Sequence, residues 1–250
     1  MFSVFAQIKI CKNRADEINL QRKFTSNRSG SSVNKISYLL LSIAVLIISC
    51  QNAAPERTYS QAQIDSLQKV FNQYKQKKDR EFKEADWSPL TPEDKKTFRH
   101  LNYFPYDISW RFEGPIHLYR KMDSITVLGT RSGDVRPALR YGYFEFRKDG
   151  KTYRLEIIKI LPQRPGRKAH LFLGFWDETS GKETYAGGRY IDLEENKENH
   201  YVVDFNFAYN PYCAYSHRYS CAIPPLENRL PVAVTAGEKN YSHPKSKEEQ

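Results

Sequence analysis

Apolar residues repeat with a helical period in two stretches near the start of the predicted folded part. The first stretch follows Ser60, a favourable N-cap residue, and the second follows Thr91, where Pro92 suits the first helical turn. The charged end of the first stretch, residues 75–83, predicts a solvated face. The apolar positions that define the first helix lie three or four residues apart: Ile64, Leu67, Phe71 and Tyr74.

From about residue 106 the pattern changes to alternating or continuous apolar runs, which are typical of β-strands. The clearest pair occupies residues 140–160, where Asp149 and Gly150 predict a tight hairpin turn. Further strands are expected at residues 124–130, 169–176, 184–193, 200–209 and 230–236. Short strands without intervening helices predict a mainly β fold, namely a single antiparallel β-sandwich or half-open barrel domain with a short N-terminal helical segment.

These patterns divide the chain into five parts. We expect N-terminal helices at residues 60–99, a β domain at residues 100–241 and a polar tail at residues 242–250. The longest apolar run, residues 38–49, is short for a membrane span but has the length of a signal-peptide core. A signal segment is therefore expected at residues 1–49, with a tether at residues 50–59.

The end of the apolar run, "IISC", resembles the lipobox of bacterial lipoproteins. The resemblance implies that Cys50 is lipidated and becomes the new N-terminus. Gln51, and not Asp, follows this cysteine, which resembles the lipoproteins that are passed on to the outer membrane. The implied location is the outer membrane of a Gram-negative bacterium, facing the periplasm. The alternative is an uncleaved signal anchor.

Removal of the signal segment changes the charge of the chain. The whole sequence has 39 Lys and Arg against 29 Asp and Glu, whereas the part after residue 49 keeps 32 and 27, a formal charge of +5. The sequence has no arginine-rich block or RNA-binding aromatic motif, which argues against nucleic acid as a partner. The expected partner is the membrane, through the lipid on Cys50.

Four stretches resemble a bacterial family known only as domain-of-unknown-function family 1684: "DETSGKETYAGGRYIDL", "DFNFAYNPYCAY", "SCAIPPLENRL" and "AGEK". The resemblance covers roughly residues 103–241. It implies a shared fold and no particular activity. His217 stands outside the motif of that family.

Polar residues of these stretches form a candidate ligand site. In a strand at 200–209, Asp204 and Asn206 would share one face. Two prolines would stiffen the backbone just before Glu227 and Asn228. We expect a polar rim that binds a small polar ligand or a partner, formed by Asp204, Asn206, Tyr209, Asn210, Glu227, Asn228, Arg189 and Asp177.

Other interpretations of the same residues stay open. The side chains of the rim could cap turns, and Arg189 could form a structural ion pair with Asp177 or Asp204. An envelope hydrolase would use Asp204 or Glu227 as general base and Arg189 to stabilise negative charge, although the sequence has no G-x-S-x-G or H-E-x-x-H motif. A third alternative is a purely structural envelope protein. Two adjacent glycines, Gly187 and Gly188, predict a bulge or the close approach of another backbone.

Cys213 and Cys221 enclose the sequence "AYSHRYS" and allow three interpretations. In an oxidising envelope a disulfide closing this short loop is the expected state. Alternatively the two cysteines and His217 would be zinc ligands completed by a fourth donor, or one cysteine would be a catalytic thiol with His217 as base. No cofactor is predicted, and zinc is the less expected alternative.

Overall fold

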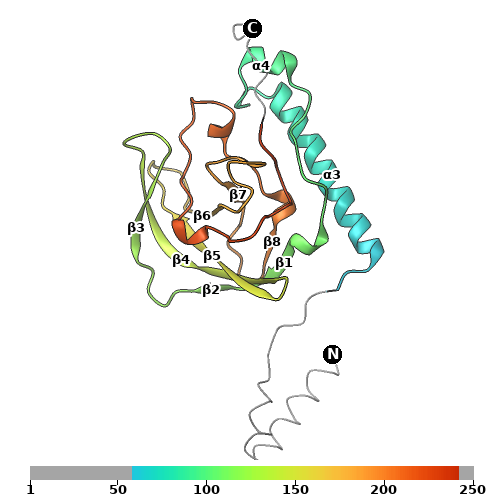
Figure 1. Cartoon of the computed structure of the whole chain (residues 1–250). Helices are drawn as coiled ribbons and strands as arrows, with labels where there is room; N and C mark the ends of the chain where they lie inside the picture. Colours follow the sequence, from blue (N-terminus) through green and yellow to red (C-terminus); the bar gives the residue numbers. More distant parts are fainter. Residues whose placement is uncertain (1–57, 242–250) are drawn as a thin grey trace, which may run out of the picture. The chain divides into compact units, whose positions relative to one another are not determined.

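A computed structural model describes residues 58–241 of the 250-residue chain (Figure 1). The expected signal segment, Cys50, the tether as far as residue 57 and the polar tail lie outside the described residues. Within residues 58–241, no helix combines the length and the apolar character needed to cross a bilayer.

Helix α3, Gln61–Glu84, runs along one side of the β-rich body (Figure 1). It begins at Ser60, whose hydroxyl accepts the N–H of Gln63 while the Gln63 side chain accepts the Ser60 N–H, so the predicted N-cap is confirmed. Helix α4, Pro92–Thr97, begins in the same way at Thr91. The predicted solvated end of α3 is confirmed at Lys77, Arg80 and Lys83, which are exposed. It does not hold for Phe82, which is buried, or for Lys78, whose side chain is only 12% exposed.

The main sheet is antiparallel throughout, in the order β2-β4-β5-β6-β7, with β3 also paired to β4. Strands β4 and β5 meet at Asp149 and Gly150, whose φ angles of 50° and 75° confirm the predicted hairpin turn. The strands are β2 Ile116–Leu118, β3 Ser124–Leu128, β4 Val135–Lys148, β5 Lys151–Ile160, β6 His170–Phe175 and β7 Arg189–Ile191.

A second, two-stranded antiparallel sheet pairs β1, Arg111–Gly114, with β8, Tyr201–Asp204. The main core contains residues of both sheets. At its centre Phe205 has no exposed surface and its ring meets that of Phe175 edge to face, with centroids 5.1 Å apart. The predicted class, mainly antiparallel β with an N-terminal helix, is confirmed, and the sheets of the described residues do not close into a barrel.

Three predicted strands are shorter than expected or missing. The strand predicted at 200–209 ends at Asp204, because the Asp204 carboxylate accepts the N–H of Asn206 at 3.0 Å and starts a 3-10 turn, Phe205–Phe207. Of the strand predicted at 184–193 only β7 forms. Residues 230–236 form no strand, although Val234 and Ala236 are fully buried. Two short strands, β1 and β2, were not predicted.

The close backbone approach predicted at the paired glycines is confirmed at Gly188. Its φ is +87°, and a Cβ placed there would lie 2.7 Å from the carbonyl oxygen of Phe175. Gly166 has a similar φ of +79° but open space around it. The two glycines therefore separate the cost of a left-handed backbone from the cost of a steric clash.

We expect Gly188→Ala to lower the free energy of unfolding by more than ~2 kcal/mol, because strain and clash add. Gly166→Ala, the matched control, should cost about 1 kcal/mol, from backbone strain alone. Urea unfolding followed by far-UV circular dichroism measures both. Equal losses in the two variants would contradict the packing described for Gly188.

Candidate functional site

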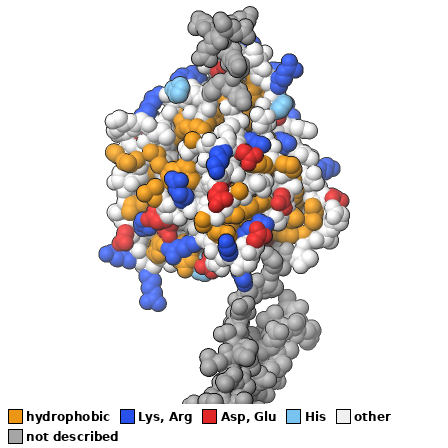
Figure 2. All heavy atoms as spheres, viewed as in Figure 1, with side chains coloured by type: hydrophobic (Ala, Val, Ile, Leu, Met, Phe, Trp, Pro, Cys, Tyr) orange, Lys and Arg blue, Asp and Glu red, His pale blue; other side chains and the backbone are white. Residues whose placement is uncertain are grey.

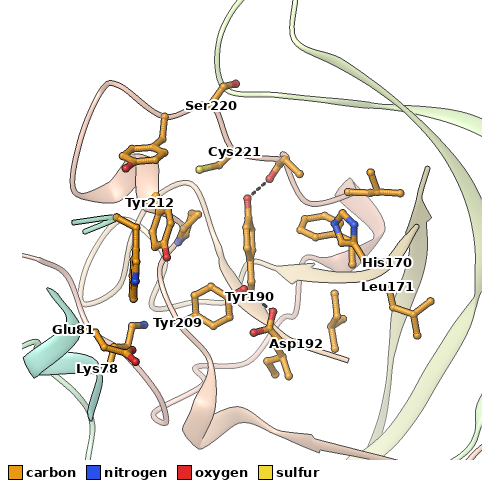
Figure 3. A pocket seen from close by; sticks show the side chains of 18 of the residues that line it. Lys78, Glu81, His170, Leu171, Tyr190, Asp192, Tyr209, Tyr212, Ser220 and Cys221 are labelled. Carbon is orange, nitrogen blue, oxygen red and sulfur yellow. Dashed lines mark hydrogen bonds between the residues drawn. The ribbon is translucent and has the colours of Figure 1, made fainter. Parts of the chain in front are cut away.

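A cavity of about 570 Å³ lies between α3 and the main sheet (Figure 3). Aromatic side chains dominate its walls, and a smaller number of charged and polar groups lie among them. The aromatic residues are Tyr74, Phe82, Trp87, Phe172, Tyr190, Tyr209, Tyr212 and Tyr219. The charged or ionisable residues are Lys77, Lys78, Glu81, Arg136, His170, Asp192 and Cys221.

Two tyrosines hold the sheet side of the pocket. Tyr190 on β7 and Tyr209 exchange backbone hydrogen bonds of 2.9 and 3.0 Å, although Tyr209 lies outside any strand. The Tyr209 hydroxyl donates to Asp192 at 2.7 Å, and the Tyr190 hydroxyl donates to the carbonyl of Ala222 (Figure 3). Burial raises the pKa of both phenols, so they stay neutral hydrogen-bond donors.

Lys78 anchors the helix side of the pocket. Its ammonium group donates to Glu238 at 2.8 Å and lies 4.9 Å from the ring centroid of Tyr209. Burial alone would lower the pKa of Lys78, but the Glu238 carboxylate raises it above its usual value, so the lysine is charged. The spacing of four between Tyr74, Lys78 and Phe82 marks one helix face, and this signal was available in the sequence but masked by the neighbouring charges.

The mouth of the pocket carries exposed aromatic surface. The rings of Trp87 and Tyr212 are stacked, with centroids 6.4 Å apart and an interplanar angle of 24°, and the two residues are 50% and 36% exposed. Tyr219 packs edge to face on Tyr212 at 5.1 Å. This arrangement presents flat apolar surface to solvent beside the polar groups inside. Sequence reasoning missed these three residues. The aromatic density around Cys213 was a signal for Tyr212 and Tyr219 only, because Trp87 lies far from it in the sequence.

The residues of the predicted polar rim are distributed over several separate places. Arg189 and Asp177 form a fully buried ion pair of 2.6 Å. The second Asp177 oxygen accepts the N–H of Thr179 at 2.6 Å. The guanidinium group of Arg189 also donates to three backbone carbonyls, those of Val234, Ala236 and Glu238. Arg189 thus has the alternative role considered from the sequence, a structural ion pair, and its partner is Asp177.

Asp204 and Asn206 lie together near the N-terminus of β1. One oxygen of Asp204 accepts from both nitrogens of Asn206, and the other lies 3.3 Å from Arg111. Asn206 also bonds the backbone of Asp107 through both its oxygen and its nitrogen. Burial raises the pKa of Asp204 above its usual range. The two side chains thus satisfy each other and the adjacent backbone.

Asn210, Asn228 and Glu227 have three different environments. The buried Asn210 side chain donates to Glu238 at 3.1 Å, and Asn228 bonds the backbone of Glu156 through both its side-chain oxygen and its nitrogen. Glu227 is exposed and pairs with Arg140, which holds the pKa of its carboxyl below the usual range. Of the predicted rim residues, Tyr209 lines the aromatic pocket, and Glu227 lines a second cavity of about 590 Å³ beside β5.

Cys213 and Cys221 are unbonded thiols in this structure. The backbone N–H of Cys213 points at the Cys221 sulfur, 3.2 Å away. Among residues 58–241, no three His, Cys, Asp or Glu side chains are grouped so that they could hold a metal ion. His217 is exposed in the loop between the two cysteines.

Two substitutions distinguish a structural carboxylate from an exposed one. Asp177→Asn leaves the buried charge of Arg189 without its counter-charge and should lower the free energy of unfolding by about 3–5 kcal/mol. Glu227→Gln removes one partner of an exposed ion pair, so a change of about 1 kcal/mol or less is expected. Chemical denaturation of both variants tests this ranking, and a larger loss for Glu227→Gln would reverse it.

The comparisons with known proteins agree with the motif resemblance. The model of the family described as "Protein of unknown function (DUF1684)" matches residues 96–239. An uncharacterized protein of Haloarcula marismortui, solved by solution NMR, is 33% identical with a TM-score of 0.54, and the match covers 72% of this chain and 97% of that chain. No functionally curated protein matches. This chain therefore belongs to the DUF1684 family.

Proposed function

We propose that this chain is a lipid-anchored cell-envelope protein that binds a small ligand with a flat apolar face and a polar edge. The observation that carries the proposal is the aromatic pocket between α3 and the sheet. Its volume of about 570 Å³ is within the usual range for small-molecule sites, which are mainly apolar with a few fixed polar groups.

Preorganisation of the walls supports a binding role. Tyr190, Tyr209 and Lys78 are each held by a hydrogen bond to a group of the protein itself. Side chains fixed in this way lose little conformational freedom when a ligand arrives. The stacked rings of Trp87 and Tyr212 leave a flat apolar surface that a planar ligand would cover.

The charges around the pocket favour an uncharged or singly anionic ligand. Lys77 is largely exposed, and its salt bridge to Glu81 is long, at 3.7 Å, so its charge is only weakly neutralised. His170 is exposed at the start of β6.

On the face seen in Figure 2, basic and acidic side chains are interspersed and hydrophobic atoms reach the surface between them. Such a surface offers no continuous basic patch for nucleic acid on that face.

The geometry favours binding over hydrolysis. Asp204 accepts hydrogen bonds on both oxygens, and the charge of Arg189 is neutralised by Asp177 inside the core. Glu227 is a weak base because Arg140 lowers its pKa. A general base needs a free oxygen within reach of substrate, and none of these groups lines the aromatic pocket.

The anchor rests on the lipobox resemblance at Cys50. The full chain should partition with membranes and incorporate labelled palmitate in its bacterial host. Cys50→Ala should abolish the label, whereas Cys11→Ala, the matched control, should retain it. Label that persists in Cys50→Ala, or that is missing from the unmodified chain, would refute lipidation at this residue.

Ligand binding can be tested by thermal melting against substituted benzoates and aryl glycosides. A ligand at a concentration far above its Kd should raise the Tm by about 5 °C or more. Trp87→Ala and Tyr212→Ala should lose most of the shift, because they remove the flat surface at the mouth. His117→Ala is the matched control, an exposed ring on β2 that stacks on Tyr143 outside the pocket. A panel that gives no shift, or shifts that survive both pocket variants, would contradict the proposal.

A further inference from the structure

The two cysteines approach each other across a short loop. Cys213 lies in a 3-10 turn, Tyr212–Ala214, and its N–H points at the sulfur of Cys221 at 3.2 Å. The hydroxyl of Tyr185 donates to the Cys213 sulfur at 3.6 Å. Both cysteines are half-buried, so they are neither sealed in the core nor fully exposed. The pair thus combines proximity with access.

Neighbouring residues fix the backbone at the Cys221 end of the pair. Thr130 and Cys221 exchange hydrogen bonds, in which the Thr130 hydroxyl accepts the Cys221 N–H at 3.1 Å and the Cys221 carbonyl accepts the Thr130 N–H at 2.9 Å. Arg136 donates to the carbonyl of Ser220 at 2.8 Å. Cys221 itself lines the aromatic pocket (Figure 3). The Cys221 end of the loop is therefore anchored to β4 and to the segment that holds Thr130.

We propose that Cys213 and Cys221 form a thiol–disulfide exchange site at the wall of the pocket, with Cys213 as the attacking thiolate, Cys221 as the resolving thiol and a low-molecular-weight disulfide as substrate. The site does not depend on the ligand proposed for the pocket. The exchange reaction is measured on the two cysteines and the binding on ligand-induced shifts of the Tm, so either proposal can be refuted without the other.

The exchange proceeds in two balanced steps. The Cys213 thiolate attacks one sulfur of the substrate disulfide, forms a mixed disulfide and expels the other sulfur as a thiolate. The proton of the Cys221 thiol passes to that leaving thiolate. The Cys221 sulfur then attacks the Cys213 sulfur, closes the internal disulfide and releases the second substrate thiolate. The protein cysteines are oxidised by two electrons, and the substrate disulfide is reduced to one thiol and one thiolate. The thiolate takes from solvent the proton that Cys213 had lost.

The hydrogen bonds around the sulfurs assign the two roles. Hydrogen bonds from Cys221 and then from Tyr185 and Thr130 lower the pKa of Cys213 to about 6, against the opposing effect of burial. The hydrogen bond to Cys213 raises the pKa of Cys221, which keeps its proton. A thiolate is the reactive form of cysteine. The other titratable or charged groups that act on the pair are Tyr190 and Arg136.

The first experiment follows exchange with glutathione disulfide on the full chain after reduction and desalting. Trypsin cuts after Lys197, Arg218 and Arg229, so the two cysteines fall in separate peptides that only a disulfide can join. We expect the joined peptides to appear with glutathione disulfide and to disappear again with excess reduced glutathione under native conditions. Cys221→Ser should accumulate glutathione on Cys213, and Cys213→Ser should react several-fold more slowly at Cys221.

Three outcomes would overturn the proposal. The cysteines could stay reduced, the joined peptides could resist native reduction as a permanent structural disulfide would, or Cys221 could react faster than Cys213. The first two outcomes are read on the unmodified chain, so they do not depend on the folding of a variant.

The second experiment measures the rate of iodoacetamide labelling at Cys213 against pH, with the same peptides as readout. The rate should reach half its maximum near pH 6, the pKa given by the hydrogen bonds around this sulfur. Tyr185→Phe removes one donor to the thiolate and should move the midpoint to higher pH. Tyr143→Phe, a phenol on β4 that stacks on His117, is the matched control and should leave it unchanged. An unshifted midpoint in Tyr185→Phe would refute the role of that hydroxyl.

Discussion

The buried positive charge of Arg189 is the constraint on which the rest of this structure depends. A guanidinium group without exposed surface needs a counter-charge and several acceptors, and it obtains them from Asp177 and from the carbonyls of residues 234, 236 and 238. The last of these residues, Glu238, binds Lys78 of α3. One connected set of charges therefore positions the C-terminal segment, the helix and the pocket between helix and sheet.

The same constraint explains one of the places where sequence reasoning about strands failed. Residues 230–236 have the apolar character of a strand, but carbonyls of this segment face Arg189 and are not available to a sheet ladder. At 200–209 the alternation is equally convincing until Asp204 bonds the N–H of Asn206 and turns the chain. Local signals such as the Ser60 cap and the Asp149-Gly150 turn were sufficient for the helices and the hairpin, because each depends on neighbouring residues alone.

The candidate site was harder to predict for a related reason. Asn206, Asn210 and Asn228 are the kind of residues that bind ligands, but here they satisfy backbone groups of the protein. Asn206 and Asn210 bond irregular segments, and Asn228 bonds Glu156 of β5 beyond the end of its pairing with β6. Lys78 was the opposite case, because its charge suggested solvent although it is buried against Glu238. The contacts of Asn206 with Asp107 and of Lys78 with Glu238 join residues more than 90 positions apart. The periodicity of the sequence carries no information about such contacts.

The family model covers one wall of the pocket and not the other. The family match begins at residue 96, whereas α3 ends at Glu84 and Trp87 follows it. The sheet wall therefore lies within the matched domain, and the helix wall precedes it. A relative that keeps the matched domain but carries another preceding helix would share half of this pocket. A ligand found for one such member would therefore not transfer to another on the strength of the matched domain alone.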